Sequence, residues 1–229
     1  MTEYLLKHLR EMVKEEGRWS SKPGWPFLDS TWVVSGEKRK NLVVGVWECV
    51  DRDLELDDDA TLTFSFDDDD EKPLEAIEVV EVVAGVLLQW LRNLQEGVVP
   101  QDIWPDVYKT GADKKLAEEV LDKLFTSFSP VHANVFVYLT GFIMEIVSLL
   151  SSPLPSQSPP KDTDIITGPL SPIQGVLPFG RSRVARGEIV KHTTLEVFAE
   201  AIIRKKGGNK TAEDKRKAVA FLEVFVSDI

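Results

Sequence analysis

The sequence predicts an all-α protein, and three observations support this class. Apolar residues recur three and four positions apart in several long segments, a spacing that places them on one face of an α-helix. Typical helix starts precede some of these segments, such as Pro73 before one and Thr211 before another. The chain has 229 residues, of which 43% are hydrophobic, so it can bury a core of its own.

The N-terminal half contains three predicted helices. Residues 2–15 carry an apolar stripe formed by Tyr4, Leu5, Leu9, Met12 and Val13. Residues 38–53 are rich in the β-branched residues typical of strands, but their apolar positions recur at helical spacing, so we predict a helix. The third helix runs from Pro73 to about Leu94, and we expect Trp90 to lie on its buried face.

The C-terminal half contains at least four more predicted helices. Residues 113–128 have a clear apolar face, and Ser129-Pro130 opens the next helix, which contains His132. Helical patterning resumes over 193–206 and ends at Gly207-Gly208, after which Thr211 is expected to cap the last helix. Together the segments predict about seven to nine helices.

Two segments interrupt this pattern. Residues 51–72 hold eleven Asp or Glu and two basic residues, a net charge of −9, which is typical of a solvated, self-repelling loop. Residues 151–192 are rich in Ser and Pro and are far longer than an ordinary connection of about 4–6 residues. We therefore predict one domain over 1–229 with two flexible insertions, an acidic loop at 51–72 and a Ser/Pro-rich segment at 151–192.

The composition argues against several classes of partner and location. A formal charge of −11 and a pI of about 4.8 make nucleic acid an unexpected partner. Cys49 is the single cysteine, which excludes an internal disulfide and fits a reducing, cytoplasmic compartment. The N-terminus lacks the pattern of a signal peptide. The longest apolar run, interrupted by Glu145, falls short of the ~18 residues of a membrane span, so we expect a core helix and no membrane insertion.

No catalytic constellation is visible in the sequence. The chain has three histidines and none of the common phosphate-, dinucleotide-, zinc- or serine-hydrolase motifs. His132 follows Pro130 at a predicted helix start, where a histidine is usually hydrogen-bonded into local structure. We therefore predict no metal site, no cofactor and no intrinsic active site, which favours a protein-binding module.

Four segments, in the right order, resemble the Rho GTPase-activating (RhoGAP) domain family. Residues 86–108, "VLLQWLRNLQEGVVPQDIWPDVY", resemble the family's apolar helix ending in "FLRELPEPLIP", and residues 124–146 resemble its "LPxxHxxLLxxLxxFLxxV" helix. Residues 193–204 resemble "NLAxVFxPNLLR", and residues 213–226 resemble the last helix. Within the family, the chain is most similar to the RhoGAP-like domain of Lowe-syndrome type inositol polyphosphate 5-phosphatases.

The resemblance implies a fold, partners and a location. The fold would be a RhoGAP-like helical bundle, and the partners would be Rho-family small GTPases such as Rac or Cdc42. The Lowe-type subgroup also implies binding of endocytic adaptor peptides and peripheral association with endosomal or Golgi membranes. By the same resemblance, the chain would be the C-terminal part of such a phosphatase or a stand-alone descendant of one.

The residues expected to activate a GTPase are missing from the matching positions. The family's catalytic arginine follows the aromatic residue of "EGIFR", whereas in "EEGRWSSKPG" Trp19 is followed by Ser20. A serine cannot supply the delocalised positive charge of an arginine finger. Leu88 replaces the family lysine and Ala201 replaces the family asparagine. The sequence therefore predicts a catalytically degenerate domain.

Three points stay open at the level of sequence. Arg18 lies two residues before Ser20, so a shifted loop would let it act as a displaced finger in an active GTPase-activating protein. Arg92 matches a family arginine that faces the GTPase, but it would also be favourable as a cation near a helix C-terminus without any partner. A helical scaffold that no longer binds GTPases is the third possibility.

Overall fold

The computed structural model describes residues 1–14, 23–52, 76–151, 179–203 and 211–226. Within these ranges the chain forms eight α-helices and two short 3-10 helices, and no strand. The 3-10 helices are η1 (Asp29–Thr31) and η2 (Gln101–Ile103), and the α-helices are α1 (Thr2–Lys14), α2 (Gly36–Asp51), α3 (Ala76–Asn93), α4 (Trp104–Thr110), α5 (Lys114–Ser127), α6 (Pro130–Ser151), α7 (Phe179–Ile202) and α8 (Ala212–Val226). The predicted class and the predicted number of helices are confirmed.

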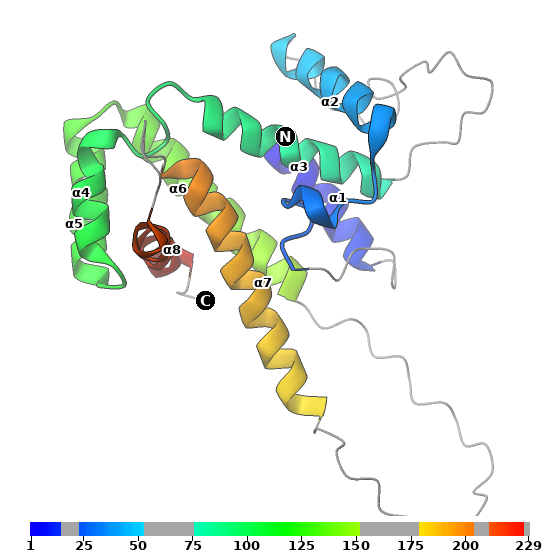
Figure 1. Cartoon of the computed structure of the whole chain (residues 1–229). Helices are drawn as coiled ribbons and strands as arrows, with labels where there is room; N and C mark the ends of the chain where they lie inside the picture. The colour runs from blue at the N-terminus through cyan, green and yellow to red at the C-terminus, as the bar shows by residue number, and fades with distance from the viewer. Residues whose placement is uncertain (15–22, 53–75, 152–178, 204–210, 227–229) are drawn as a thin grey trace, which may run out of the picture.

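Helix α3 lies at the centre of the bundle. Its sequence is apolar on nearly every side, and its residues from Val79 to Leu91 are buried except for Gly85, Gln89 and Trp90. It is covered by α1, α2 and α7, which come from both ends of the chain (Figure 1). Burial of an apolar side chain contributes roughly 1.5–3 kcal/mol, so this helix provides much of the stability of the fold.

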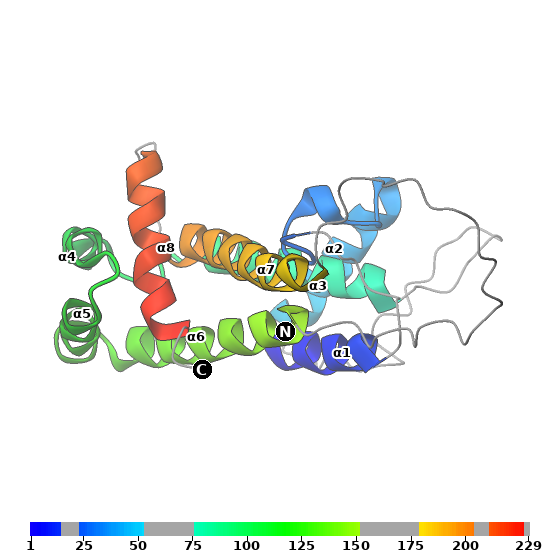
Figure 2. The same ribbon diagram turned by 90° about the horizontal axis from the view of Figure 1, so that it is seen from below.

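Aromatic side chains join α6 to the helices that follow it. Phe142 on α6 and Phe198 on α7 pack with Phe27, their ring centroids 4.9–6.5 Å apart. Phe136, also on α6, packs against two phenylalanines of α8. Figure 2 shows α8 standing across α6 at the end of the bundle nearest to α4 and α5. One end of the molecule therefore contains α4, α5 and α8, and the other contains α1, α2 and the start of α3.

Among the described residues, one helix, α6, has the length and apolar composition that would let it cross a membrane. Its buried side chains belong to the same hydrophobic core as those of α3 and α7. The burial of Ala133, Phe136 and Ile143 is what the sequence predicts for a core helix.

Two helix starts are capped by side chains, and one of these caps, Thr211, was predicted from the sequence. The Thr211 hydroxyl accepts a hydrogen bond from the Asp214 amide at 3.1 Å, and the Asp214 carboxylate accepts one from the Thr211 amide at 3.0 Å. This reciprocal arrangement satisfies two backbone donors at the start of α8. Asp113 caps α5 by accepting from the Leu116 amide. The predicted cap at Thr211 is confirmed.

The predicted end of the Ser/Pro-rich insertion is wrong. The sequence analysis placed residues up to 192 in the insertion, whereas α7 begins at Phe179. Val190 is buried, and Lys191 pairs with Glu223 of α8 at 2.9 Å, so this part of the helix packs on the bundle. Residues 179–192 contain few apolar residues, so the sequence shows no helical spacing of apolar positions there. Residues 152–178, and the acidic segment after Arg52, lie outside the described part of the chain.

Two further differences concern the region of α3 and α4. Trp90 is half-buried at the edge of the core, because the side chains that face inward beside it are Leu87, Leu88 and Leu91. The short helix α4 was not predicted, since seven residues give too little periodicity to detect.

The contact between Gly85 and Trp32 provides a test of the packing on α3. A Cβ atom at Gly85 would lie 2.7 Å from Cζ2 of Trp32, and this ring is held by its own hydrogen bond to the Pro26 carbonyl at 2.6 Å. We expect Gly85→Ala to lower the free energy of unfolding by about 1–3 kcal/mol through overpacking, as measured by urea denaturation.

The matched control is Gly141→Ala on α6, where a Cβ atom would have open space. This change is expected to raise the free energy of unfolding by about 0.5–1 kcal/mol, because alanine has a higher helix propensity than glycine. Equal effects of the two substitutions would contradict the described contact between Trp32 and α3.

Candidate functional site

The connection between α3 and η2, residues 94–100, forms a tight turn at the C-terminal end of the central helix. Gly97 has a φ of +73°, a conformation that glycine adopts without strain, and its amide donates to the Leu94 carbonyl at 3.2 Å. Pro100 then leads into η2 and α4. Gln95 and Glu96 lie exposed at the start of the turn, and Val98 and Val99 after it are buried in the core.

Three hydrogen bonds from different elements hold this connection in place. The Val99 amide donates to the Ile202 carbonyl at the end of α7 at 3.3 Å. The Val99 carbonyl accepts from the indole nitrogen of Trp104 on α4 at 3.1 Å. The Val98 carbonyl lies 3.2 Å from Nδ1 of His132 on α6. The position of the 94–100 connection is therefore set by α4, α6 and α7 together.

His132 is the polar link between this connection and α6. Its Nε2 atom lies 3.2 Å from a carboxylate oxygen of Glu96, while its other ring nitrogen contacts Val98. The ring also packs edge-on against Phe128, with centroids 6.4 Å apart. The side chain of His132 is hydrogen-bonded, as the sequence predicts, but its partners lie 34 and 36 positions away rather than in the local structure of α6.

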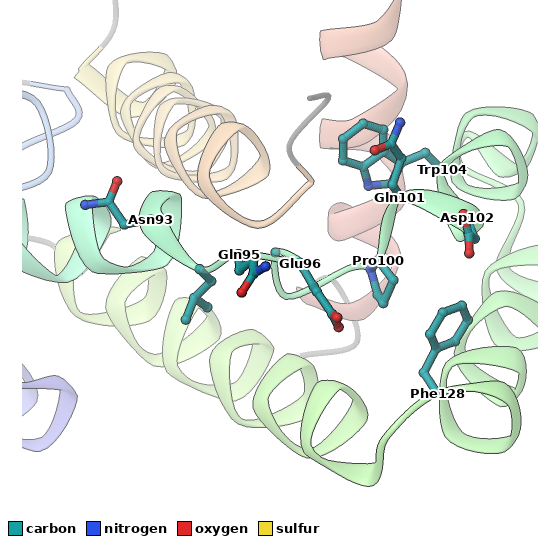
Figure 3. A pocket seen from close by; sticks show the side chains of 10 residues that line it. Asn93, Gln95, Glu96, Pro100, Gln101, Asp102, Trp104 and Phe128 are labelled. Atoms are coloured by element: carbon teal, nitrogen blue, oxygen red, sulfur yellow. The ribbon is translucent and has the colours of Figure 1, made fainter. Parts of the chain in front are cut away.

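A hollow of about 750 Å³ opens between this connection and the corner where α5 meets α6 (Figure 3). Figure 3 shows Glu96 and Phe128 projecting toward the space between the two segments. The lining residues are Asn93, Leu94, Gln95, Glu96, Gly97, Pro100, Gln101, Asp102, Trp104 and Phe128. The hollow is thus formed by residues that lie within 36 positions of one another in the sequence.

The lining combines acidic, amide and apolar side chains. Glu96 and Asp102 supply carboxylates, Asn93, Gln95 and Gln101 supply amides, and none of the lining side chains is basic. Phe125 and Val131, on either side of the α5–α6 corner, are also exposed. Such a surface suits a protein partner that offers basic or donor groups beside an apolar patch.

The residues singled out from the sequence lie in different places. Arg92 is half-buried in the last turn of α3, next to the hollow but not part of its lining. Arg18 and Ser20 lie outside the described residues. Leu88 and Ala201, which the sequence resemblance aligns with the family lysine and asparagine, are 2% and 0% exposed and belong to the hydrophobic core. No group of three or more potential metal ligands occurs in the part of the chain that the structure describes.

One comparison with known protein families gives a match that bears directly on the hollow. Residues 58–152 match the RhoGAP domain. RhoGAP domains activate Rho-family GTPases, so the match indicates interaction with such a GTPase or activation of its hydrolysis. The matched RhoGAP stretch covers 95 of the 229 residues and contains every residue that lines the hollow.

The match agrees with the all-helical fold, which is that expected of a RhoGAP helical bundle. It ends before α7 and begins after α2, so Ala201 and the segment containing Arg18 and Ser20 fall outside it. No curated protein matches the chain. The similarity to the Lowe-type subgroup, and the adaptor peptides that it implies, therefore stay predictions from the sequence.

Sequence reasoning missed the hollow and several of its residues. Asp102, Trp104 and Phe128 were not predicted as site residues, because nothing in their own segments distinguishes them from other residues. The only signal was the sequence "QEGVVPQDIWP", in which Gly97 and Pro100 mark a break between two helices. A break of this kind predicts a loop, but it does not predict which distant segments will surround it.

The His132 contacts can be tested by substitution. We expect His132→Ala to lower the free energy of unfolding by about 1–2 kcal/mol, since the Val98 carbonyl loses its side-chain partner on α6. Amide hydrogen exchange at Val98 and Val99 should accelerate more than exchange elsewhere in the core, because the connection loses one of its three attachments.

His192→Ala is the matched control, since His192 is exposed and its Nδ1 atom lies 3.7 Å from Glu196 on the same helix. We expect it to change the free energy of unfolding by less than about 0.5 kcal/mol. A loss for His132→Ala no larger than that of the control would show that His132 does not anchor the connection.

Proposed function

We propose that this protein binds Rho-family GTPases through the hollow and its rim, and that it accelerates GTP hydrolysis little. The observation that carries the proposal is that the entire lining of the hollow falls within the stretch that matches the RhoGAP domain. This hollow is thus made by the part of the chain that resembles a GTPase-activating domain.

The proposed lack of activation rests on three positions. An arginine finger stabilises the charge that develops on the transferred phosphoryl group and contributes about 10³–10⁵ to the rate. The matching position is Ser20, which has no positive charge. The positions of the family lysine and asparagine hold Leu88 and Ala201, and both side chains are buried among apolar residues. Neither can donate a hydrogen bond to a GTPase.

The alternative is an active domain in which Arg18 serves as a displaced finger. Single-turnover GTP hydrolysis by Rac- and Cdc42-type GTPases distinguishes the two functions, using the wild type, Arg18→Ala and Ser20→Arg. We expect the wild type to stimulate hydrolysis far less than the ~10³-fold of an arginine finger. Arg18→Ala should change little, and Ser20→Arg should restore little because Leu88 and Ala201 remain. Strong stimulation that is lost in Arg18→Ala would establish the displaced finger.

Binding requires a separate measurement, because a domain that does not stimulate GTP hydrolysis gives no signal in the hydrolysis assay. We expect the double substitution Glu96→Lys and Asp102→Lys to weaken binding of the GTP-analogue form of the GTPase at least tenfold by reversing the charge of the hollow. The matched control is Glu118→Lys with Glu119→Lys, the same charge change at two exposed positions of α5 outside the lining. Equal effects of the two pairs would place the GTPase elsewhere, and no binding to any Rho-family GTPase would favour a helical scaffold.

A further inference from the structure

Both ring nitrogens of His132 lie against oxygen atoms that accept hydrogen bonds. Nδ1 is 3.2 Å from the Val98 carbonyl oxygen, and Nε2 is 3.2 Å from a carboxylate oxygen of Glu96. A carbonyl and an ionised carboxylate cannot donate, and a neutral imidazole has one N–H group, whereas a protonated one has two. Both contacts are therefore hydrogen bonds only while His132 is protonated.

The surroundings of the two oxygens decide which contact survives when the proton leaves. Val98 is 1% exposed, and a buried carbonyl that loses its donor has no water to replace it. The Glu96 side chain is 74% exposed, so water can solvate its carboxylate. The neutral ring therefore keeps its Nδ1–H on the Val98 carbonyl, and its Nε2 lone pair faces a carboxylate that also only accepts. Loss of the proton thus releases Glu96.

The ion pair with Glu96 is the one that the structure records for His132 among the described residues. The elements around the ring carry other ionisable groups, and most of these are already paired. They are Arg92 in the last turn of α3, Asp102 on η2, Asp106 of α4 paired with Lys123 of α5, Tyr138 of α6 bonded to Thr2, Glu145 of α6 paired with Arg10, and Lys191 of α7 paired with Glu223 of α8.

Glu96 is also a lining residue of the hollow, where it and Asp102 supply the carboxylates and no lining side chain is basic. When His132 is protonated, its positive charge offsets that of Glu96 and repels a cation that approaches the hollow. When His132 is neutral, Glu96 keeps its full charge for a partner. A proton on His132 and a basic side chain of a partner therefore compete, and each weakens the binding of the other.

We propose that His132 regulates binding at the hollow through its ring proton. The protonated ring binds Glu96 in competition with a basic side chain of the GTPase, and the neutral ring leaves Glu96 to that side chain. Histidine ordinarily changes its charge between about pH 5 and 8, so the affinity for the GTPase rises with pH across this range. The rise is about two- to fivefold, because Glu96 is largely exposed and exposed ion pairs are weak. The regulation rests on the proposed function for its partner, whereas the protonation of the ring is independent of it.

The first readout is ¹⁵N NMR of the histidine rings, which distinguishes a proton on Nδ1, a proton on Nε2 and the doubly protonated form. The chain has three histidines, and His132→Asn identifies the His132 signal by its loss. At about pH 8.5, above the ordinary range of histidine titration, we expect His132 to carry its proton on Nδ1. The exposed ring of His192 is the internal comparison. A proton found mainly on Nε2 of His132 would show that the Val98 bond is not the one retained, and would overturn the proposal.

The second readout is the affinity of the full chain for a Rac- or Cdc42-type GTPase loaded with a non-hydrolysable GTP analogue, measured from about pH 6 to about pH 8. In His132→Asn, the asparagine NH₂ takes about the place of Nδ1–H and can donate to the Val98 carbonyl, but it does not titrate. We expect the wild-type affinity to rise about two- to fivefold relative to that of His132→Asn across this range. If His132→Asn fails to fold, Glu96→Gln takes its place, because it keeps the ring and removes the carboxylate that the proton controls.

His192→Asn is the matched control, the same substitution at an exposed histidine outside the lining of this hollow. It should follow the wild-type pH profile, and the GTPase's own titration is common to every comparison. A wild-type profile that runs parallel to that of His132→Asn, or that falls with pH relative to it, would overturn the proposal while leaving GTPase binding intact. If the wild type binds no Rho-family GTPase at any pH, the proposed function and its regulation both fail, and the NMR spectrum still decides which nitrogen keeps the proton.

Discussion

Helix α3 has to be covered on nearly every side, and the arrangement of the other helices follows from that requirement. An amphipathic helix can leave one face in water, but α3 has apolar residues around most of its circumference from Val79 to Leu91, with Gln89 exposed. The helices α1, α2 and α7 supply the cover, and they come from distant parts of the chain. The one carboxylate in this environment, Glu81, is compatible with burial because donors from a single segment surround it.

The same requirement explains why the candidate site lies where it does. A fully buried helix has to reach the surface at an end, and α3 does so at Asn93, where the chain turns at Gly97. The residues that follow are fixed by hydrogen bonds from three other helices, so their side chains have defined positions. A binding surface built on such fixed elements loses little conformational entropy when a partner docks.

Much of the fold could be predicted from the sequence, since the helices of this protein are mostly amphipathic and carry their own start signals. Residues 2–14, 114–127 and 212–226 show this clearly, and the cap at Thr211 has the expected geometry. The start of α7 was missed because residues before 190 carry too few apolar side chains to produce a period. The short α4 was missed for want of length.

The site was less predictable than the fold. The resemblance to RhoGAP domains aligns Leu88 and Ala201 with the family's lysine and asparagine. Both side chains are buried, as expected of apolar residues. The hollow itself depends on which helices surround the 94–100 connection. The partners of Glu81 likewise lie 47 to 56 positions away in the sequence. Such contacts follow from the packed structure and leave no local pattern to detect.

The hydrogen bond from Val99 to Ile202 also bears on the order in which the molecule is completed during synthesis. Ile202 lies 50 residues beyond the end of the RhoGAP-matching stretch, on a helix that also covers α3. Chains are made from the N-terminus at about 5–20 residues per second. One of the three hydrogen bonds that fix the 94–100 connection can therefore form only after α7 has left the ribosome. A nascent chain shorter than about 200 residues has its own hollow-lining residues but not this attachment.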